Sequence, residues 1–371
     1  MRVVITGGGT GGHLFPALAV CECLQARRPE APVLFVGAVG GVEAGILPRL
    51  GHAFRGLAVS QVKGKGRGRQ IRALLGLPKT VREAWGVLRE FHPDVVLGVG
   101  GYASFPTVVA AALGRIPRVI HEQNAIPGLA NRWLGRLASA VAVSFEASAA
   151  AFRGRRVVVT GSPVRAAIRP GDRPSARERL GLSRGAFTVL VFGGSQGAHR
   201  LNTAMLEALP ELSGERERLQ FAHATGEKDL AEVRAAYARH QVRARVEPFF
   251  EVMASVYQAA DFALCRAGAG TVFELQTMGL PALLVPFPFA ANDHQRANAE
   301  ALVSAGAAWT VPEAYCDGRR IAATVKAAME KPALLGEMGA AARALARPDA
   351  AARVVDLLEA VARQAGGPPE C

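Results

Sequence analysis

The sequence predicts an α/β protein built from two Rossmann-like domains in tandem, and three observations lead to that fold. Short apolar runs alternate with longer Ala- and Leu-rich stretches along most of the 371 residues. The first run, at 3–5, leads directly into the glycine-rich segment 6–13. A similar run at 188–192 restarts the pattern and leads into a second glycine loop at 193–198. Such alternation indicates a parallel sheet covered by helices, here formed twice.

In the first half, further strand-length runs lie at residues 33–36, 94–99, 117–120, 140–143 and 157–160. The pattern lapses at 166–186, so we place the domains at 1–164 and 165–347. The remaining segment, about 348–371, is predicted as a helix that packs back on the first domain, because its apolar residues recur at helical spacing. These residues are Val354, Leu357, Leu358 and Val361.

In the second half, the predicted strands lie at residues 219–224, 243–247, 261–264, 281–285 and 307–311. Sheets of this kind bind ligands at the carboxyl ends of their strands. We therefore expect the two domains to face each other across a cleft that is lined by glycine loops from both.

Composition limits the classes of function. A hydrophobic content of 50% is enough for two domains with well-filled cores. Lys and Arg number 44 against 31 acids, a net charge of +13, which favours partners that carry phosphate or an anionic membrane surface. Five cysteines without a Cys-x-x-Cys pair suggest reduced thiols. We expect no signal peptide and no membrane span, and hence a protein that is soluble or at most peripheral.

The first glycine segment, residues 6–13, reads Thr-Gly-Gly-Gly-Thr-Gly-Gly-His. We expect the next helix to begin near His13, with Pro16 in its first turn, where a missing N–H costs nothing. Bare backbone at a helix N-terminus suits an anion. His13 is the side chain of this segment that can titrate near neutral pH, which makes it a candidate base.

A nicotinamide dinucleotide site is an alternative for this loop, because Gly7, Gly9 and Gly12 fit the pattern G-x-G-x-x-G. Such a site uses an acid at the end of the second strand, whereas that strand here leads into Gly37. A tight turn without any ligand is the other alternative.

Four glycine loops follow predicted strands, at residues 7–12, 98–101, 193–197 and 268–270. One such loop is common, but four shared between two domains favour a diphosphate ligand and a second phosphorylated partner. Glu274 lies in the first turns of the helix after the fourth loop, where a carboxylate can accept ribose hydroxyls or simply stabilise the helix. The segment 286–295 ends in Asn-Asp-His-Gln, a cluster that suits sugar hydroxyls.

Residues 63–72 hold five positive charges, and apolar side chains follow within a helix-like stretch. Basic groups beside exposed apolar ones favour docking on anionic lipid, while an ordinary solvated loop before a core helix is the alternative. The predicted membrane residues are Lys63, Lys65, Arg67, Arg69, Leu74, Leu75, Leu77 and Trp85. Nucleic-acid binding would also use this charge, but aromatics are 6% and no nucleic-acid motif is present, so we expect no nucleic-acid partner.

Several motifs together resemble the MurG family, in order from residue 1 to about 310. They are Gly8-Gly9-Thr10-Gly11-Gly12-His13, Gly100-Gly101-Tyr102, His121-Glu122-Gln123-Asn124, Pro163-Val164-Arg165, Gly193-Gly194-Ser195-Gln196-Gly197-Ala198, the Glu274 loop and Asp293-His294-Gln295. The resemblance implies the GT-B fold and a peripheral enzyme at the cytoplasmic face of the membrane. Its activity would be transfer of GlcNAc from UDP-GlcNAc to lipid I, undecaprenyl-diphospho-MurNAc-pentapeptide, giving lipid II.

The resemblance also implies which residues bind UDP-GlcNAc. Uracil would lie against the backbone of Phe250, ribose on Glu274, and diphosphate near Ser195 and Arg165. The rest of the implied donor set is Thr10, Gly11, Gly12, Asn124, Ala269, Gly270, Thr271, Val272, Phe273 and Gln295. The chain departs from the family at Ser162, where members usually carry Asn, and at Phe250, where many carry an aliphatic residue.

The acceptor diphosphate is expected at the glycine backbone of the first domain, and His13 is the expected general base. The residues of this acceptor site are Gly9, Gly100, Gly101 and Tyr102. No Asp-x-Asp pair is present to hold a divalent metal, so we expect catalysis without a metal or cofactor. The enzymatic alternatives are another GT-B UDP-sugar transferase or a UDP-GlcNAc 2-epimerase, and a basic nucleic-acid-binding protein is the alternative that is not an enzyme.

Overall fold

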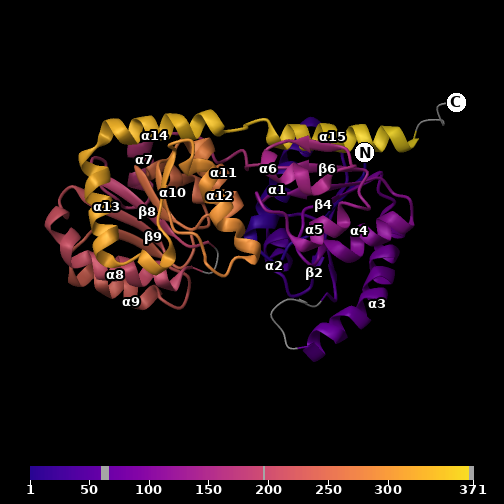
Figure 1. Ribbon diagram of the computed structural model, residues 1–371, viewed down its shortest axis with the longest axis horizontal. Helices are drawn as coiled ribbons and strands as arrows, with labels where there is room; N and C mark the ends of the chain where they lie inside the picture. The colour runs from indigo at the N-terminus through magenta and orange to yellow at the C-terminus, as the bar shows by residue number, and fades with distance from the viewer. Residues whose placement is uncertain (60–66, 195–196, 367–371) are drawn as a thin grey trace. The chain divides into compact units, whose positions relative to one another are not determined.

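The computed structural model describes residues 1–59, 67–194 and 197–366 (Figure 1). The chain forms two compact units, one made of Met1–Arg165 with Arg347–Cys371 and the other of Ala166–Ala346. Each unit has a parallel sheet with helices on both faces, so the predicted pair of α/β domains is confirmed.

Among the described residues, the first unit holds a seven-stranded sheet in the order β3-β2-β1-β4-β5-β6-β7. Its strands are β1 (Val3–Thr6), β2 (Val33–Ala38), β3 (Phe54–Leu57), β4 (Val95–Gly98), β5 (Arg118–Glu122), β6 (Ala140–Val143) and β7 (Val157–Val159). Its helices are α1 (Gly11–Arg27), α2 (Val42–Arg49), α3 (Arg67–Phe91), α4 (Ser104–Leu113), α5 (Leu129–Leu134), α6 (Glu146–Ala149) and α15 (Ala350–Gly366). The edge strand β3 was not predicted, because Arg55 and Gly56 interrupt Phe-Arg-Gly-Leu, so it does not stand out as an apolar run.

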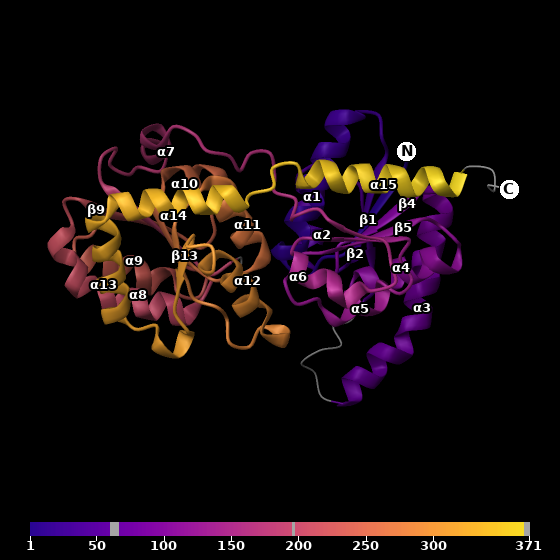
Figure 2. The same ribbon diagram turned by 45° about the horizontal axis from the view of Figure 1, so that its top comes forward.

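Side chains of β1 alternate between the two faces of this sheet. Val3 and Ile5 pack with α1 and with the apolar face of α15, whereas Val4 packs on the face covered by α3 and α4. The helix α15 lies against α1 (Figures 1 and 2). Arg28 also forms an ion pair of 2.9 Å with Glu359, which ties the end of α1 to α15.

The second unit holds, within the described ranges, a six-stranded sheet in the order β10-β9-β8-β11-β12-β13. Its strands are β8 (Phe187–Phe192), β9 (Leu219–Ala224), β10 (Ala244–Glu247), β11 (Phe262–Cys265), β12 (Ala282–Leu284) and β13 (Ala308–Thr310). Its helices are α7 (Arg173–Arg179), α8 (His199–Leu212), α9 (Leu230–Arg239), α10 (Met253–Ala259), α11 (Ala269–Met278), α12 (His294–Val303), α13 (Gly318–Glu330) and α14 (Pro332–Leu345). Its core is the large apolar cluster between the sheet and α8, α9 and α13.

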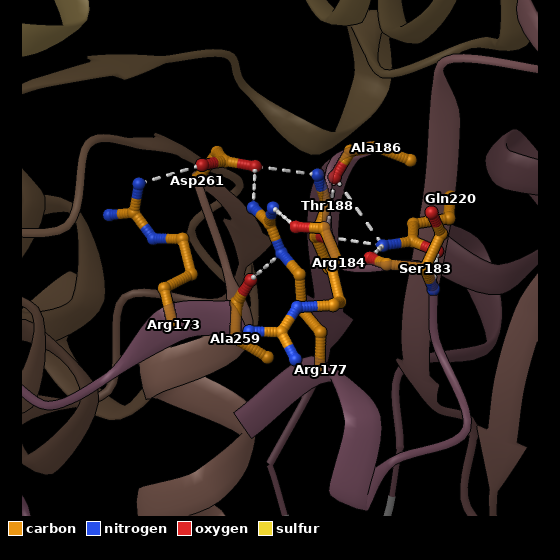
Figure 3. A network of polar contacts seen from close by, with 9 residues as sticks. All are labelled: Arg173, Arg177, Ser183, Arg184, Ala186, Thr188, Gln220, Ala259 and Asp261. Carbon is orange, nitrogen blue, oxygen red and sulfur yellow. Dashed lines mark hydrogen bonds and ion pairs between the residues drawn. The ribbon is translucent and has the colours of Figure 1, made fainter. Parts of the chain in front are cut away.

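A polar network joins the amino ends of β8, β9 and β11 (Figure 3). Asp261 accepts a 2.7 Å hydrogen bond from the backbone of Thr188 and forms ion pairs with Arg173 and Arg177. Gln220 of β9 donates to the Thr188 hydroxyl at 2.9 Å. The network therefore stabilises the amino ends of these strands, which lie opposite the carboxyl ends where ligands of such sheets bind.

Candidate active site

The four glycine loops follow the two central strands of each sheet. β1 lies beside β4 with Thr6 opposite Gly98, and β8 lies beside β11 with Phe192 opposite Cys265. The strand order reverses at these two pairs, and ligands of open α/β sheets bind at such switch points. Each unit therefore presents two glycine loops at the place where this architecture forms a binding crevice.

The first loop wraps around a buried carboxylate. Glu43, near the start of α2, is 1% exposed and accepts hydrogen bonds from the backbone N–H groups of Gly9 at 2.8 Å and Ala38 at 2.9 Å. Gly8 has φ +140°, and a Cβ placed there would lie 2.3 Å from the Glu43 carboxyl carbon. The Gly9 N–H is thus already used, so a diphosphate contact through it, as predicted, would require Glu43 to move.

The helix α1 begins at Gly11, two residues before the predicted start, with Thr10 as the extended N-cap. Pro16 is therefore inside the helix, and its predicted position in the first turn is wrong. Because proline has no N–H, it cannot donate to the carbonyl of Gly12 one turn earlier. The two glycines that open α1 give no side-chain signal for the start of a helix, which explains the error.

His13 lies in the first turn of α1, half-buried, where three loops of the first unit meet. Its Nδ1 is 3.2 Å from Oε1 of Gln123, in the loop after β5. Cβ atoms placed on Gly100 and Gly101 would lie 3.1 and 3.4 Å from its ring, and both glycines have positive φ angles. The ring of Tyr102 packs against Gly9 in the same way. The predicted base and acceptor residues are thus brought together.

Within the segment 121–124, the carboxylate of Glu122 organises the loop that follows β5. Glu122 is buried and accepts hydrogen bonds from the backbone of Asn124 and Gly128, and also from the side chains of Asn124 and Asn131, at 2.9 to 3.2 Å. These contacts shape the loop and hold Asn124 at its half-buried position. These hydrogen bonds therefore hold Asn124 beyond the carboxyl end of β5.

In the second unit, the fourth glycine loop opens α11 directly. Gly268 is the N-cap, so Ala269 and Gly270, which belong to the implied donor set, are the first helical residues. Val272 and Phe273 are buried, and the N–H of Val272 donates to the carbonyl oxygen of Gly268 at 3.0 Å. Glu274 is half-buried in the second turn, and its Oε2 accepts a 2.7 Å hydrogen bond from Tyr257 of α10. Sequence reasoning missed Tyr257, because a buried tyrosine gives no local signal of its partner.

The other predicted donor residues lie in different settings. Gln295, in the first turn of α12, accepts a 2.9 Å hydrogen bond from the backbone of Phe287 through Oε1. Phe250 is buried in the loop that follows β10. Arg165, in the first unit, forms a 2.9 Å ion pair with Glu22 of α1. Ser195 falls outside the described residues.

The structure does not describe most side chains of the predicted membrane segment. Lys63 and Lys65 are not among the described residues, and for Arg67, Arg69, Leu74 and Leu75 the structure describes the α3 backbone alone. Leu77 is half-buried. Trp85 belongs to the margin of an apolar cluster, and its ring fills the space beside Gly114 at the end of α4, which favours a packing role for it.

The part of the chain that the structure describes contains neither a candidate membrane-spanning helix nor a candidate metal site. No helix in it combines the length and apolar content that crossing a membrane requires. Nor do three or more His, Cys, Asp or Glu side chains gather in it as a possible metal site.

Comparison with known proteins identifies the family. The model of the glycosyltransferase family 28 N-terminal domain matches residues 3–143, and that of the C-terminal domain matches residues 188–354. A Geobacter sp. (strain M21) protein is named UDP-N-acetylglucosamine–N-acetylmuramyl-(pentapeptide) pyrophosphoryl-undecaprenol N-acetylglucosamine transferase. It is 46% identical over 355 residues, which cover 96% of this chain and 95% of that protein. The chain belongs to the MurG family.

The crystal structure of MurG from Acinetobacter baumannii agrees, with 32% identity and a TM-score of 0.73 over 97% of this chain and 99% of that chain. Membership in the MurG family confirms the predicted GT-B fold and makes the chain a glycosyltransferase. A UDP-GlcNAc 2-epimerase of Neisseria meningitidis, bound to UDP-GlcNAc, has a TM-score of 0.68 but 15% identity, over 97% of this chain and 100% of that one. That likeness shows the fold alone.

Proposed function

We propose that the protein transfers GlcNAc from UDP-GlcNAc to the 4-hydroxyl of MurNAc-pentapeptide on undecaprenyl diphosphate, which converts lipid I to lipid II. The observation that supports this most directly is the position of His13 in the first turn of α1, against the backbone of Gly100 and Gly101. A candidate base beside glycine backbone at a switch point suits an acceptor whose hydroxyl lies near a diphosphate.

In this reaction His13 takes the proton of the acceptor hydroxyl as its oxygen attacks the anomeric carbon of GlcNAc. The bond between that carbon and the UDP oxygen breaks, and UDP leaves with the electron pair. Attack from the face opposite UDP inverts the anomeric configuration, so an α-linked donor gives a β-linked product. General base catalysis of this kind contributes about 100- to 10,000-fold in rate.

The second unit would bind most of the donor. Glu274 would accept the ribose hydroxyls, the backbone of Phe250 would face uracil, and Gln295 would bind GlcNAc. The N–H groups of Ala269 and Gly270, which open α11, supply positive potential toward the leaving diphosphate. Charge-assisted bonds of the kind that the guanidinium of Arg165 can donate are worth about 1.5 to 3 kcal/mol each.

The first unit would supply further contacts to the substrates. Thr10, Gly11, Gly12 and Asn124 would contact GlcNAc, and Gly100, Gly101 and Tyr102 would lie along the acceptor diphosphate. Gly100 and Gly101 lie against the His13 ring, and the other residues of this set belong to the loops after β1, β4 and β5 or to the start of α1. Arg165 would exchange its ion pair with Glu22 for the donor diphosphate.

The test is UDP release from UDP-GlcNAc, measured with and without a polyprenyl-diphospho-muramoylpentapeptide acceptor. We expect release that depends on the acceptor, and a disaccharide product. Release without acceptor, with formation of ManNAc, would instead support the epimerase. In the same assay His13→Ala should lower turnover by about 100- to 10,000-fold while calorimetry shows nearly unchanged UDP-GlcNAc binding. His240→Ala, at the C-terminal cap of α9, is the matched control. Turnover of His13→Ala equal to wild type would remove His13 as the base.

We also propose that residues 63–72 dock the protein on an anionic membrane surface, with Leu74, Leu75 and Leu77 contributing apolar contact. Each Lys or Arg near such a surface adds about 1 kcal/mol. Replacing Lys63, Lys65, Arg67 and Arg69 with Gln should release the protein from phosphatidylglycerol vesicles in a flotation assay. The matched control makes the same change at four exposed arginines of the second unit, which are Arg216, Arg239, Arg243 and Arg319. Equal vesicle binding by both variants would exclude this segment.

A further inference from the structure

A chain of buried polar contacts ends on the ring of His13. Nδ1 of His13 lies 3.2 Å from Oε1 of Gln123, and Nε2 of Gln123 lies 2.6 Å from the carbonyl oxygen of Val99. The same Nε2 is 3.2 Å from Nδ1 of His121. Gln123 and His121 are each 1% exposed, so the chain is withdrawn from solvent.

The Val99 carbonyl determines which way the Gln123 amide is oriented. A carbonyl oxygen can only accept, so the amide atom at 2.6 Å must be the NH₂ group. The flipped amide would place two acceptor oxygens at that distance, with a repulsive contact in a buried site. The Gln123 oxygen therefore faces His13.

His121 supports the same orientation from the other side. Burial lowers the pKa of His121 to about 4, so its ring is neutral at pH 7 and has one acceptor nitrogen. Its Nε2 lies 3.4 Å from the carbonyl oxygen of Gly161 and 3.3 Å from the hydroxyl of Ser144. A proton on that Nε2 can be donated to either oxygen, which leaves Nδ1 as the acceptor for the second N–H of Gln123.

We propose that Gln123 is a positioning residue, which holds the proton of neutral His13 on Nδ1 and so makes Nε2 the nitrogen that accepts the acceptor's proton. The reason is that an amide oxygen facing Nδ1 can only accept, and the nitrogen beside it must donate. The hydrogen bond made by one ring nitrogen of a histidine determines which nitrogen carries the proton. The contact with Gln123 therefore selects the basic nitrogen of His13 before substrate binds. The inference rests on the proposed function, in which His13 is the base.

The direct test is the tautomer of His13, read from the imidazole ¹⁵N shifts of protein labelled at histidine. The His13 signals are assigned by their absence in His13→Ala. We expect the Nδ1–H form in the wild type at pH 8, although the Nε2–H form is the commoner one for histidine in water. The Nε2–H form at His13 in the wild type would overturn the proposal.

The variant Gln123→Met keeps the side-chain volume but removes both the donor and the acceptor. We expect its His13 to lose the Nδ1–H preference, and kcat to fall about 10- to 100-fold as the base loses its orientation. The KM for UDP-GlcNAc should change less than twofold. The matched control is Gln220→Met in β9, because Gln220 is also fully buried and donates to Ser183 and Thr188 in the second unit. This control should leave the His13 shifts and kcat unchanged.

A double-mutant cycle separates positioning from an independent role. If Gln123 acts through His13, Gln123→Met should have no further effect on kcat in the His13→Ala background. An equal fold-loss in both backgrounds, or an unchanged His13 tautomer in Gln123→Met, would overturn the proposal. The proposed role of His13 as the base fails in a different measurement. In that case His13→Ala keeps full turnover, while the tautomer of His13 in the wild type can still be measured.

Discussion

The hydroxyl of Tyr257 donates a 2.7 Å hydrogen bond to Oε2 of Glu274. Tyr257 is 1% exposed on α10, and burial together with the Glu274 carboxylate raises its pKa well above the usual range. The hydroxyl therefore keeps its proton and donates at every pH at which the protein is assayed. Its ring also packs edge-on against Phe192 at the end of β8. This tyrosine fixes the rotamer of the carboxylate that is proposed to bind ribose.

Tyr257→Phe removes the hydroxyl alone. We expect the KM for UDP-GlcNAc to rise roughly 3- to 10-fold, a part of the 1.5 to 3 kcal/mol that a hydrogen bond to a charged group is worth. The kcat should stay within twofold, because the ribose is remote from the reacting bond. Tyr237→Phe is the matched control, since its equally buried hydroxyl lies 3.2 Å from His223 instead. An unchanged KM in Tyr257→Phe would show that Glu274 does not depend on this contact.

Glu43→Gln should loosen the first glycine loop. The carboxylate accepts from two backbone N–H groups, whereas an amide has one acceptor oxygen and would turn its NH₂ toward the other donor. We expect unfolding in urea to show a loss of about 2 kcal/mol. The KM for the lipid acceptor should rise more than that for UDP-GlcNAc. Glu30→Gln, at an exposed position, should change neither quantity. A Glu43→Gln protein as stable as wild type would contradict this account of the loop.

Asp261→Asn tests the network at the amino ends of the strands of the second unit (Figure 3). Arg177 is 5% exposed, and the substitution would leave its buried charge without a counter-ion. We expect a loss of about 3 kcal/mol in the free energy of unfolding. Adding Arg177→Met should recover most of it. Glu178→Gln breaks an exposed ion pair with Arg184 and should leave the urea midpoint unchanged. Little stability loss in Asp261→Asn would show that Arg177 is adequately solvated.

Stability should fall as the pH is lowered from about 6.5 toward 4, because two histidines are buried in neutral form. Burial lowers the pKa of His121 to about 4 and that of His223 to about 3. The unfolded chain takes up these protons near pH 6.5, before the folded chain does, so acid favours unfolding. Each histidine adds up to about 1.4 kcal/mol per pH unit to the slope. Between pH 6 and 4, the slope of stability against pH should be smaller in His223→Gln by the contribution of one histidine. The slope in His240→Gln should equal that of the wild type. Parallel slopes for His223→Gln and wild type would contradict this.

Local patterns predicted most of the fold. The runs at β1, β2, β4, β8 and β11 could be recognised because buried parallel strands are continuously apolar, and the glycine loops because each follows such a run. The edge strand β3 lacked that signal, and the start of α1 was hidden by two glycines. Glu274 and Gln295 could be selected by resemblance to the family, but their bonds to Tyr257 and to the backbone of Phe287 could not.

The sequence by itself determined the fold class, the family and the glycine loops at the switch points. The reason is that apolar runs and glycine-rich loops are patterns of a few neighbouring residues. The tertiary structure alone decided which side chains meet there. Glu43 reaches Gly9 across 34 positions, and Gln123 reaches His13 across 110. Such contacts depend on strand order and register, which pair β1 with both β2 and β4, and no local pattern encodes them. His13 was visible as a candidate base in the sequence, but the orientation of its ring nitrogens depends on a partner that only the folded chain brings to it.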